Sequence, residues 1–212
     1  MDYVTADLHF NHRGLLRFRE RQQFKTIQDH DEYVIRRLNT ALKPSDTLYI
    51  LGDVGFREGG SLESLASKIR RIECAKKILI MGNHDKFSVT EAQTKLGFDE
   101  VHKGPFYYEN TDQKGRILLS HEPAYEAFHN PYVINVHGHV HNYRLKLEEE
   151  NFYNVNIGMT SFSPISMRHF EKIAQRKCKS RQERFASEWY YRFYIFEEGD
   201  KNEESDQNCL SR

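Results

Sequence analysis

Residues 132–143 read YVINVHGHVHNY, a β-branched run that ends in three histidines at every second position. In a strand, residues two apart lie on one face, roughly 6.5–7 Å apart. Neighbouring imidazoles in such a row can flank a pair of metal ions, which lie about 3.5–4 Å apart in two-metal sites. A surface histidine cluster is the alternative interpretation. The stretch therefore predicts a strand that leads into a candidate metal site, with both interpretations open.

The composition is typical of a globular domain. The chain has 212 residues, of which 38% are hydrophobic and 29% charged. It contains no apolar run of the length that spans a bilayer, and its first residues, MDYVTADLHF, lack the regions of a signal peptide. The cysteines are Cys74, Cys178 and Cys209, an odd number with wide spacing, which favours a reducing compartment. We therefore expect a cytoplasmic protein without a membrane partner.

The charges of the chain balance, with 31 basic and 31 acidic residues. A general nucleic-acid-binding protein usually has a basic excess, so bulk electrostatics does not support that class. Local basic groups remain, and we interpret them as solvated faces. They comprise Arg13, Arg17, Arg19 and Arg21 in one segment and Lys68, Arg70, Arg71, Lys76 and Lys77 in another.

In the first half of the chain, short apolar runs alternate with stretches of helical periodicity. Pro44 and Gly97 follow two of the periodic stretches, as is typical of helix ends, and Ser61 is suited to an N-cap. The residues up to Phe24 have no clean period and predict a loop with one helical turn. The pattern predicts strands at 2–6, 47–51 and 77–81 and helices at 29–42, 61–73 and 88–96.

After Gly97 the pattern changes to consecutive strands, with a hairpin turn expected at 110–115. Ser163 and Pro164 are suited to the start of a helix that continues to Lys177. We expect residues 1–196 to form one domain, with the aromatic segment 182–196 packed on its body. The polar, acidic tail 197–212 is predicted to be disordered. The expected strands are 98–102, 106–109, 116–120, 132–136 and 152–157.

This order of elements predicts an α/β domain with a mixed sheet, or two sheets packed together under helices. Five of the expected strands run directly into side chains that can bind metal ions. The carboxyl ends of strands in α/β sheets gather at one edge, so these segments are expected to converge. They are Asp7 and His9; Asp53; Asn83, His84 and Asp85; His121; and His137, His139 and His141.

The side chains at these strand ends offer oxygen and nitrogen atoms but no thiolate. A closed, cysteine-rich structural zinc site is therefore not indicated. Imidazole-rich sets also disfavour magnesium and calcium, whereas manganese, iron, zinc, cobalt and nickel fit.

The motif order D-x-H, G-D, G-N-H-D, H, G-H-x-H across residues 7–141 resembles the calcineurin-like metallophosphoesterase superfamily. The flanking stretches HFNHRGLLRF and NIGMTSFSPIS are similar to small bacterial and phage predicted phosphoesterases. The resemblance implies two mixed β-sheets packed as a sandwich flanked by helices, the four-layer αββα arrangement.

The resemblance also implies two divalent ions, manganese first, and a role for each motif residue. Asp7, His9 and His141 would hold one ion and Asn83, His121 and His139 the other, with Asp53 between them. His84 would stand over the phosphate as general acid, and Asp85 would orient its imidazole. His137 falls outside the matched motif and is expected in a supporting role. The other histidines without a motif, expected at the surface or core edge, are His30, His102, His129 and His169.

The activity implied by this resemblance is hydrolysis of phosphate mono- or diesters by a hydroxide that bridges the two ions. We favour a phosphodiesterase for small or nucleotide-type substrates. A DNA or RNA nuclease with a local basic groove and a non-catalytic scaffold are the alternatives. His12, Arg13 and Arg21 are candidates for substrate contacts, with loop packing as the competing interpretation.

Overall fold

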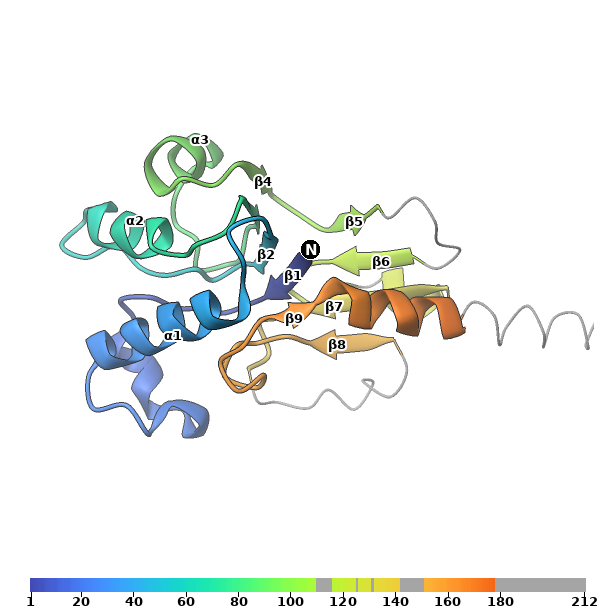
Figure 1. The fold of residues 1–212 in the computed structure, drawn as a ribbon, viewed down its shortest axis with the longest axis horizontal. Helices are drawn as coiled ribbons and strands as arrows, with labels where there is room; N and C mark the ends of the chain where they lie inside the picture. The colour runs from blue at the N-terminus through green and yellow to red at the C-terminus, as the bar shows by residue number, and fades with distance from the viewer. Residues whose placement is uncertain (110–115, 125, 131, 142–150, 178–212) are drawn as a thin grey trace, which may run out of the picture.

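The first half of the chain builds a five-stranded sheet that a later segment completes (Figure 1). The computed structural model describes residues 1–109, 116–124, 126–130, 132–141 and 151–177. In this sheet the order is β4-β3-β2-β1-β9, with the first four strands parallel and β9 antiparallel to β1. The strands are β1 (Asp2–Thr5), β2 (Thr47–Leu51), β3 (Lys76–Ile80), β4 (Glu100–His102) and β9 (Ile165–Ser166).

A second sheet of four strands has the order β5-β6-β7-β8. The first pair is antiparallel and the other two pairs are parallel. The hairpin turn predicted at 110–115 lies outside the described residues. The strands are β5 (Phe106–Tyr108), β6 (Arg116–Leu119), β7 (Val133–His137) and β8 (Phe152–Asn154).

The helices begin and end at local sequence signals. Thr26 and Asp29 form a reciprocal capping box at the start of α1, and Ser88 and Glu91 form another at α3. Gly97 ends the helical stretch after α3 in the left-handed conformation, with φ of 80°. The helical segments are η1 (Arg13–Arg17), η2 (Arg19–Arg21), α1 (Ile27–Ala41), α2 (Glu63–Arg70), α3 (Val89–Glu91), η3 (Ala92–Leu96) and α4 (Glu126–His129).

The two sheets pack face to face and share one apolar core. Because neighbouring residues of a strand point to opposite faces, β2 divides its side chains between two cores. Leu48 and Ile50 pack with the helices that cover the outer face of the first sheet, which Figure 1 shows on one side of the molecule. Leu51 packs toward the second sheet with Val136 of β7. A smaller cluster with Ala127 of α4 covers the far face of the second sheet. The expected sandwich of two mixed sheets flanked by helices is confirmed.

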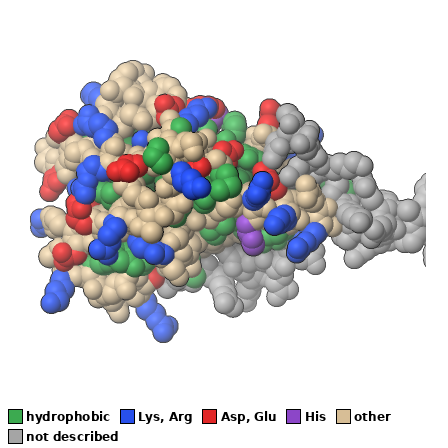
Figure 2. Space-filling view, in the orientation of Figure 1, with side chains coloured by type: hydrophobic (Ala, Val, Ile, Leu, Met, Phe, Trp, Pro, Cys, Tyr) green, Lys and Arg blue, Asp and Glu red, His purple; other side chains and the backbone are tan. Residues whose placement is uncertain are grey.

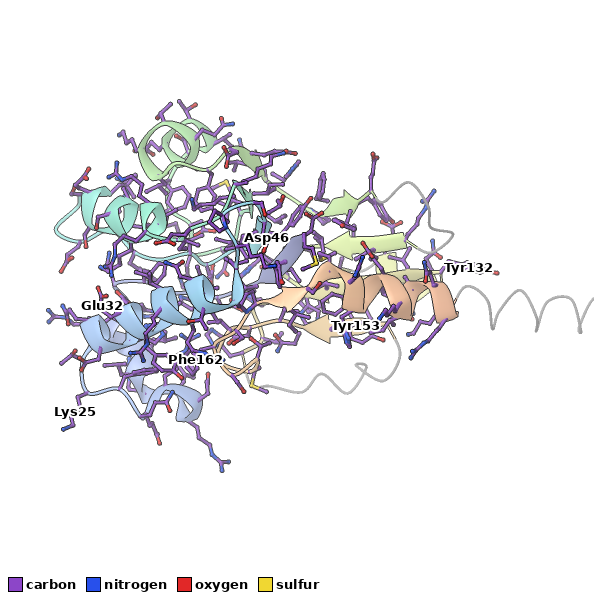
Figure 3. The ribbon with its side chains drawn as sticks, in the orientation of Figure 1. Lys25, Glu32, Asp46, Tyr132, Tyr153 and Phe162 are labelled. Carbon is purple, nitrogen blue, oxygen red and sulfur yellow. The ribbon has the colours of Figure 1, made fainter. Side chains whose placement is uncertain are left out.

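Asp46 holds the residue before β1, the strand that leads to the candidate site. The N-terminal amine donates to Asp46 Oδ1 at 2.8 Å, and Asp46 Oδ2 accepts from the backbone N–H of Lys43 at 2.9 Å. Phe162 packs edge-on against Tyr33 of α1 and against Phe24. Asp46 and Phe162 are labelled in Figure 3.

Some element boundaries differ from those predicted. Helix α2 begins at Glu63 with Leu62 at the N-cap, although Ser61 Oγ accepts from the Glu63 N–H at 3.1 Å. The helix predicted from Pro164 begins at residue 167, because residues 165–166 pair with β1 as a strand. The short helix α4 was not predicted.

The predictions for the C-terminal part fall largely outside the described residues. These exclude the aromatic segment 182–196 and the tail 197–212, so the domain limit at residue 196 stays a prediction. Among the described helices, none has the length and apolar character needed to cross a membrane.

Candidate metal centre

The structure brings the motif residues together at the carboxyl ends of strands from both sheets. Strand β1 leads to Asp7 and His9, and β2 leads to Asp53. In the second sheet, His121 follows β6 closely and His139 follows β7. Side chains separated by more than a hundred residues therefore lie in one cluster.

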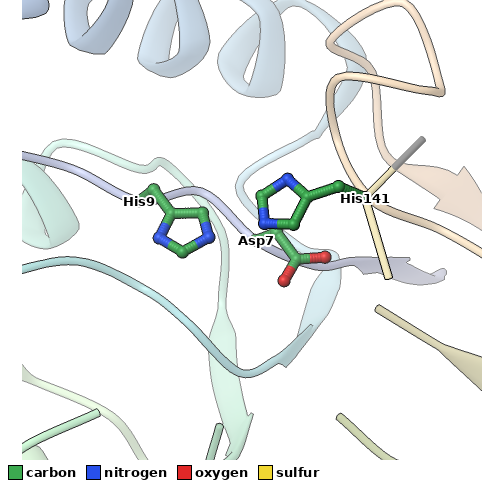
Figure 4. Close-up of side chains that lie close together, drawn as sticks. All are labelled: Asp7, His9 and His141. Carbon is green, nitrogen blue, oxygen red and sulfur yellow. The ribbon is translucent and has the colours of Figure 1, made fainter. Parts of the chain in front are cut away.

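Asp7, His9 and His141 form one group of candidate ligands (Figure 4). One ligand atom from each lies within 4.8 Å of the others. Asp7 and His9 are buried, and His141 is partly exposed. Figure 4 shows the outer ring nitrogen of His141, Nε2, directed toward Asp7 and His9. The three side chains thus face a common point.

Asn83, His121 and His139 form a second group. Asn83 Oδ1 lies 2.8 Å from His121 Nε2 and 3.2 Å from His139 Nδ1. The two imidazole nitrogens are 3.1 Å apart. Three atoms that can each present a lone pair therefore converge.

Asp53 lies between the two groups. Its Oδ2 is 3.6 Å from His9 Nε2, and its Oδ1 is 3.5 Å from His121 Nε2. Asp7 and His121 also come close enough to form a ligand group with Asp53, with the ligand atoms within 4.8 Å of one another. The carboxylate of Asp53 thus faces both halves of the cluster.

The donor set fits divalent cations. His121 Nδ1 donates to the Leu51 carbonyl at 2.9 Å, which leaves the lone pair on Nε2 free to bind a cation. Both ring nitrogens of His9 are buried and lack a hydrogen-bond partner among the described residues. Buried polar atoms without partners are costly, and a cation would satisfy the ring nitrogen of His9 that carries the lone pair.

The electrostatics of the metal-free protein supports the same interpretation. Burial and the nearby charge of Asp53 raise the pKa of Asp7 to about 8. Burial, with a smaller contribution from Arg21, lowers the pKa of His141 to about 4, and burial likewise lowers the pKa of His9 strongly. Without ions, Asp7, His9 and His141 are therefore held in their uncharged forms near neutral pH. Bound cations favour the deprotonated carboxylate and the neutral imidazole, which are the ligand forms.

The backbone is unusual at many of these positions. Non-glycine residues rarely adopt positive φ, although Asp, Asn and His do so more often than others. Such conformations cluster at functional sites, where the surrounding structure holds them in place. Positive φ angles occur at Asp7 (57°), His9 (49°), Asp53 (52°), His139 (68°) and His141 (47°).

Two motif glycines make room for the carboxylates. A Cβ at Gly138 would lie 2.5 Å from Asp7 Oδ2, and a Cβ at Gly82 would lie 2.4 Å from Asp53 Oδ1. Neither carboxylate could keep its position beside a larger residue.

His84 and Asp85 have different surroundings. The imidazole of His84 is exposed, and its backbone N–H donates to Asp53 Oδ1 at 2.9 Å. Asp85 is buried and accepts from the backbone N–H groups of Gly82, Asp53 and Val54 at 2.8–3.0 Å. The prediction that Asp85 orients the His84 imidazole is not supported by these contacts. Asp85 instead fastens the loop that carries Asp53.

His12, Arg13 and Arg21 also differ from one another. The ring of His12 is half-buried and packs on Phe56, with centroids 4.3 Å apart, and its centroid lies 6.5 Å from that of His84. Arg13 is exposed at the start of η1. Arg21 is fully buried, so a direct substrate contact by its guanidinium is not supported.

Sequence reasoning missed a buried polar network beneath the first ligand group. Arg21 donates to the Asp7 carbonyl oxygen at 2.9 Å and contacts His30 Nε2. His30 Nδ1 lies 2.9 Å from Asp31 Oδ1, and Asp31 Oδ2 accepts from the Asn11 N–H at 3.0 Å. His30 was expected at the surface or core edge. No local motif marks it, because its partner Arg21 comes from the preceding segment.

A cavity of about 420 Å³ adjoins the second ligand group. Asn83 and His121 form part of its wall, with Met81, Lys103, Pro105 and Pro123. The cavity therefore opens beside candidate metal ligands and has a mixed polar and apolar lining.

The fold and the cluster define a two-sheet α/β protein with a candidate metal centre of carboxylate and histidine side chains at its strand ends. A sequence profile described as calcineurin-like phosphoesterase matches residues 3–178. The chain belongs to this family, whose members typically are metal-dependent phosphoesterases.

Two individual proteins are also similar to this chain. The chain is 29% identical over 85 residues to the Gene 66 protein of Mycobacterium phage L5, a match that spans 39% of each protein. It also resembles the crystal structure of AQ665, a protein of unknown function from Aquifex aeolicus. That similarity has a TM-score of 0.63 and 28% identity, and it covers 82% of this chain and 98% of the other.

Proposed function

We propose that this protein is a dinuclear metal-dependent phosphoesterase. The observation that carries the proposal is the position of Asp53 between two sets of candidate ligands, with one carboxylate oxygen near each set. A bridging carboxylate between two nitrogen- and oxygen-rich sites is suited to a pair of ions that act on one substrate.

In this proposal each ligand group holds one ion and Asp53 contacts both. Asp7, His9 and His141 bind the first ion, and Asn83, His121 and His139 bind the second. Such ions, when bound, activate water and neutralise phosphate oxygens. We propose manganese, with iron, zinc, nickel and cobalt as alternatives that suit the same donors. The cysteine pattern supports a cytoplasmic location.

His84 is the proposed general acid. The imidazole of His84 is exposed, and the backbone N–H of the same residue donates to Asp53. The ring is therefore near enough to reach a phosphoester held at the centre. Proton transfer to the departing oxygen by a positioned histidine contributes typically ~10²–10⁴-fold to a rate. We also propose that His12, whose ring packs on Phe56 and lies near His84, contacts a phosphate oxygen.

We propose a small phosphodiester, such as a nucleotide-type ester, as the substrate. The cavity beside Asn83 and His121 has a volume of about 420 Å³, within the range of small-molecule sites. On the face shown in Figure 2, basic and acidic side chains are interspersed over the described part. A long nucleic acid would be expected to need a more extended basic surface.

A panel of phosphoesters tests the proposal. The protein is loaded with Mn²⁺ and offered a chromogenic diester and monoester, cyclic nucleotides, nucleoside polyphosphates and DNA. The products are identified: an alcohol and a phosphate monoester from a diester, inorganic phosphate from a monoester, a nucleoside monophosphate from a cyclic nucleotide, and shortened strands from DNA. We expect turnover of small diesters. Preferred cleavage of DNA, with binding that weakens steeply as salt rises, would support the nuclease alternative. No turnover of any ester by fully loaded protein would support the scaffold alternative.

A further inference from the structure

The segment that contains η2 packs directly on His141. The ring of Phe18 stacks on the His141 imidazole, with centroids 4.9 Å apart and planes 8° apart. Two residues later, Glu20 Oε1 lies 3.9 Å from His141 Nδ1. This segment therefore touches both a face and an edge of a candidate ligand.

The Glu20 carboxylate has an unusual environment. Its side chain is only 10% exposed. Both of its oxygens are buried and have no hydrogen-bond partner among the described residues. Burial of a carboxylate without hydrogen bonds costs free energy, so we expect a compensating interaction at this position. The local backbone accommodates it, because a Cβ at Gly158 would lie 2.6 Å from Glu20 Cγ.

The two nitrogens of His141 face different groups. Nε2 is directed toward Asp7 and His9 (Figure 4), whereas Nδ1 is the atom nearest Glu20. A neutral imidazole carries its proton on only one nitrogen. For Nε2 to offer a lone pair to an ion, Nδ1 must carry the proton, and this N–H needs an acceptor.

Glu20 is the available acceptor. The amide of Asn156 lies 3.4 Å from His141 Nδ1 through its Nδ2, which is a donor. Its oxygen already accepts from the Gly158 N–H at 2.9 Å. The equivalent proton of His121 is accepted by the Leu51 carbonyl at 2.9 Å. At 3.9 Å the Glu20 contact is about 1 Å longer than a hydrogen bond, a gap that a small side-chain rotation closes.

We infer that Glu20 is a positioning residue for the first ion. It accepts the Nδ1–H of His141 and thereby keeps the Nε2 lone pair directed toward the ion that Asp7 and His9 also bind. This inference rests on the ion sites of the proposed function. Outer carboxylates of this kind strengthen metal binding by typically ~10–100-fold.

The test compares Glu20→Met, which keeps the length of the side chain but offers no strong acceptor, with Glu20→Gln, which keeps a neutral one. Glu73→Met, at an exposed position away from the centre, is the matched control. Mn²⁺ binding is followed by calorimetry and ion content, and the melting temperature is measured after metal removal. Hydrolysis is assayed separately.

We expect two binding events in the natural protein. In Glu20→Met one event weakens about 10–100-fold, in Glu20→Gln it weakens less, and in Glu73→Met it is unchanged. The melting temperature of metal-free Glu20→Met should equal or exceed that of the natural protein, because a buried carboxylate without hydrogen bonds among the described residues has been removed. A purely structural role predicts the opposite sign for this temperature.

The inference is overturned if Glu20→Met binds both ions normally, or if both events weaken together with a lower metal-free melting temperature. If the natural protein binds two ions but hydrolyses no ester, the proposed activity fails while the role of Glu20 is still decided by affinity. If it binds no ion, both proposals fail.

Discussion

The buried guanidinium of Arg21 donates through Nη2 to the backbone carbonyl oxygen of Asp7, at 2.9 Å. This contact joins the end of η2 to the first candidate ligand after β1. The same guanidinium contacts His30, whose other nitrogen faces Asp31. The first ligand group therefore rests on a charged network that is closed to solvent.

Replacement of Arg21 should destabilise the protein. Arg21→Ala removes the donor to Asp7 and leaves Asp31 with less compensating charge, so a loss of about 3–5 kcal/mol in the free energy of unfolding is expected. Urea denaturation of the metal-free protein measures it. Arg19→Ala, at an exposed neighbouring position, should change stability by at most about 0.5 kcal/mol. Equal effects of the two substitutions would contradict the role given to the network.

Gly138→Ala should weaken metal binding. The new Cβ would lie 2.5 Å from both Asp7 Oδ2 and the Cβ of Ala6, so the carboxylate must move. We expect at least a tenfold loss of Mn²⁺ affinity, of the order found when support of a ligand is disturbed. Gly104→Ala is the control, since no atom lies within 4 Å of its added Cβ. A Gly138→Ala variant with unchanged affinity would show that Asp7 does not need its present position.

The metal-free protein should lose stability between pH 7 and 8. The pKa of Asp7 is raised to about 8 in the folded state by burial and Asp53. The folded carboxyl group therefore keeps its proton in this interval, whereas the unfolded one has lost it. Stability then falls as pH rises, by up to about 1.4 kcal/mol per pH unit. Buried histidines with a lowered pKa, such as His141, oppose this change near pH 7, where an unfolded imidazole is still about a quarter protonated, so the fall should be clearest toward pH 8.

Below neutral pH the histidines act in the opposite direction. The folded pKa of His141 is lowered to about 4, so protons favour the unfolded chain and the stability contribution of His141 is lost as pH falls from about 6.5 toward 4. The melting temperature in a chelator should be measured from pH 5 to 8. Asp7→Asn should reduce the alkaline loss and leave only the smaller part from Asp85, whose pKa burial raises to about 7. A melting temperature that rises steadily to pH 8 in the natural protein would contradict this account.

Asp53→Asn and His84→Ala should reduce turnover for different reasons. Asp53→Asn removes charge that faces both ligand groups, so ion content and turnover should fall together, turnover by orders of magnitude. His84→Ala should reduce turnover about 10²–10⁴-fold while both ions stay bound. Ion content by mass spectrometry and turnover of a chromogenic diester separate the two cases. A near-normal rate in either variant would remove that residue from the mechanism.

His12→Ala should raise KM more than it lowers kcat. A side chain that contacts the phosphate equally in substrate and transition state contributes to both, so its removal leaves kcat nearly unchanged. Steady-state kinetics with the best diester of the panel measures this. A fall in kcat alone would instead give His12 a role in the chemical step.

The sequence alone predicted the order of most elements. The apolar run 47–51 is short and is followed by Gly52. It forms a strand whose apolar side chains are buried on both faces of the sheet. Helix starts with local capping residues were also predictable, as at Ser88, since their signals lie within one turn. The strand at 165–166 was missed because its pairing partner is β1, at the other end of the chain.

The residue types of the candidate centre were also determined by the sequence. Asp and His follow apolar strands in D-x-H and G-H-x-H, and glycine is needed where a Cβ would strike Asp7 or Asp53. Only the tertiary structure decided which atoms meet. It directed the Asp85 carboxylate to three backbone N–H groups, buried Arg21 beneath Asp7 and placed Glu20 beside His141. These contacts join segments distant in sequence, and packing of the two sheets and their loops, which no local pattern encodes, brings them within hydrogen-bond or ion-pair distance.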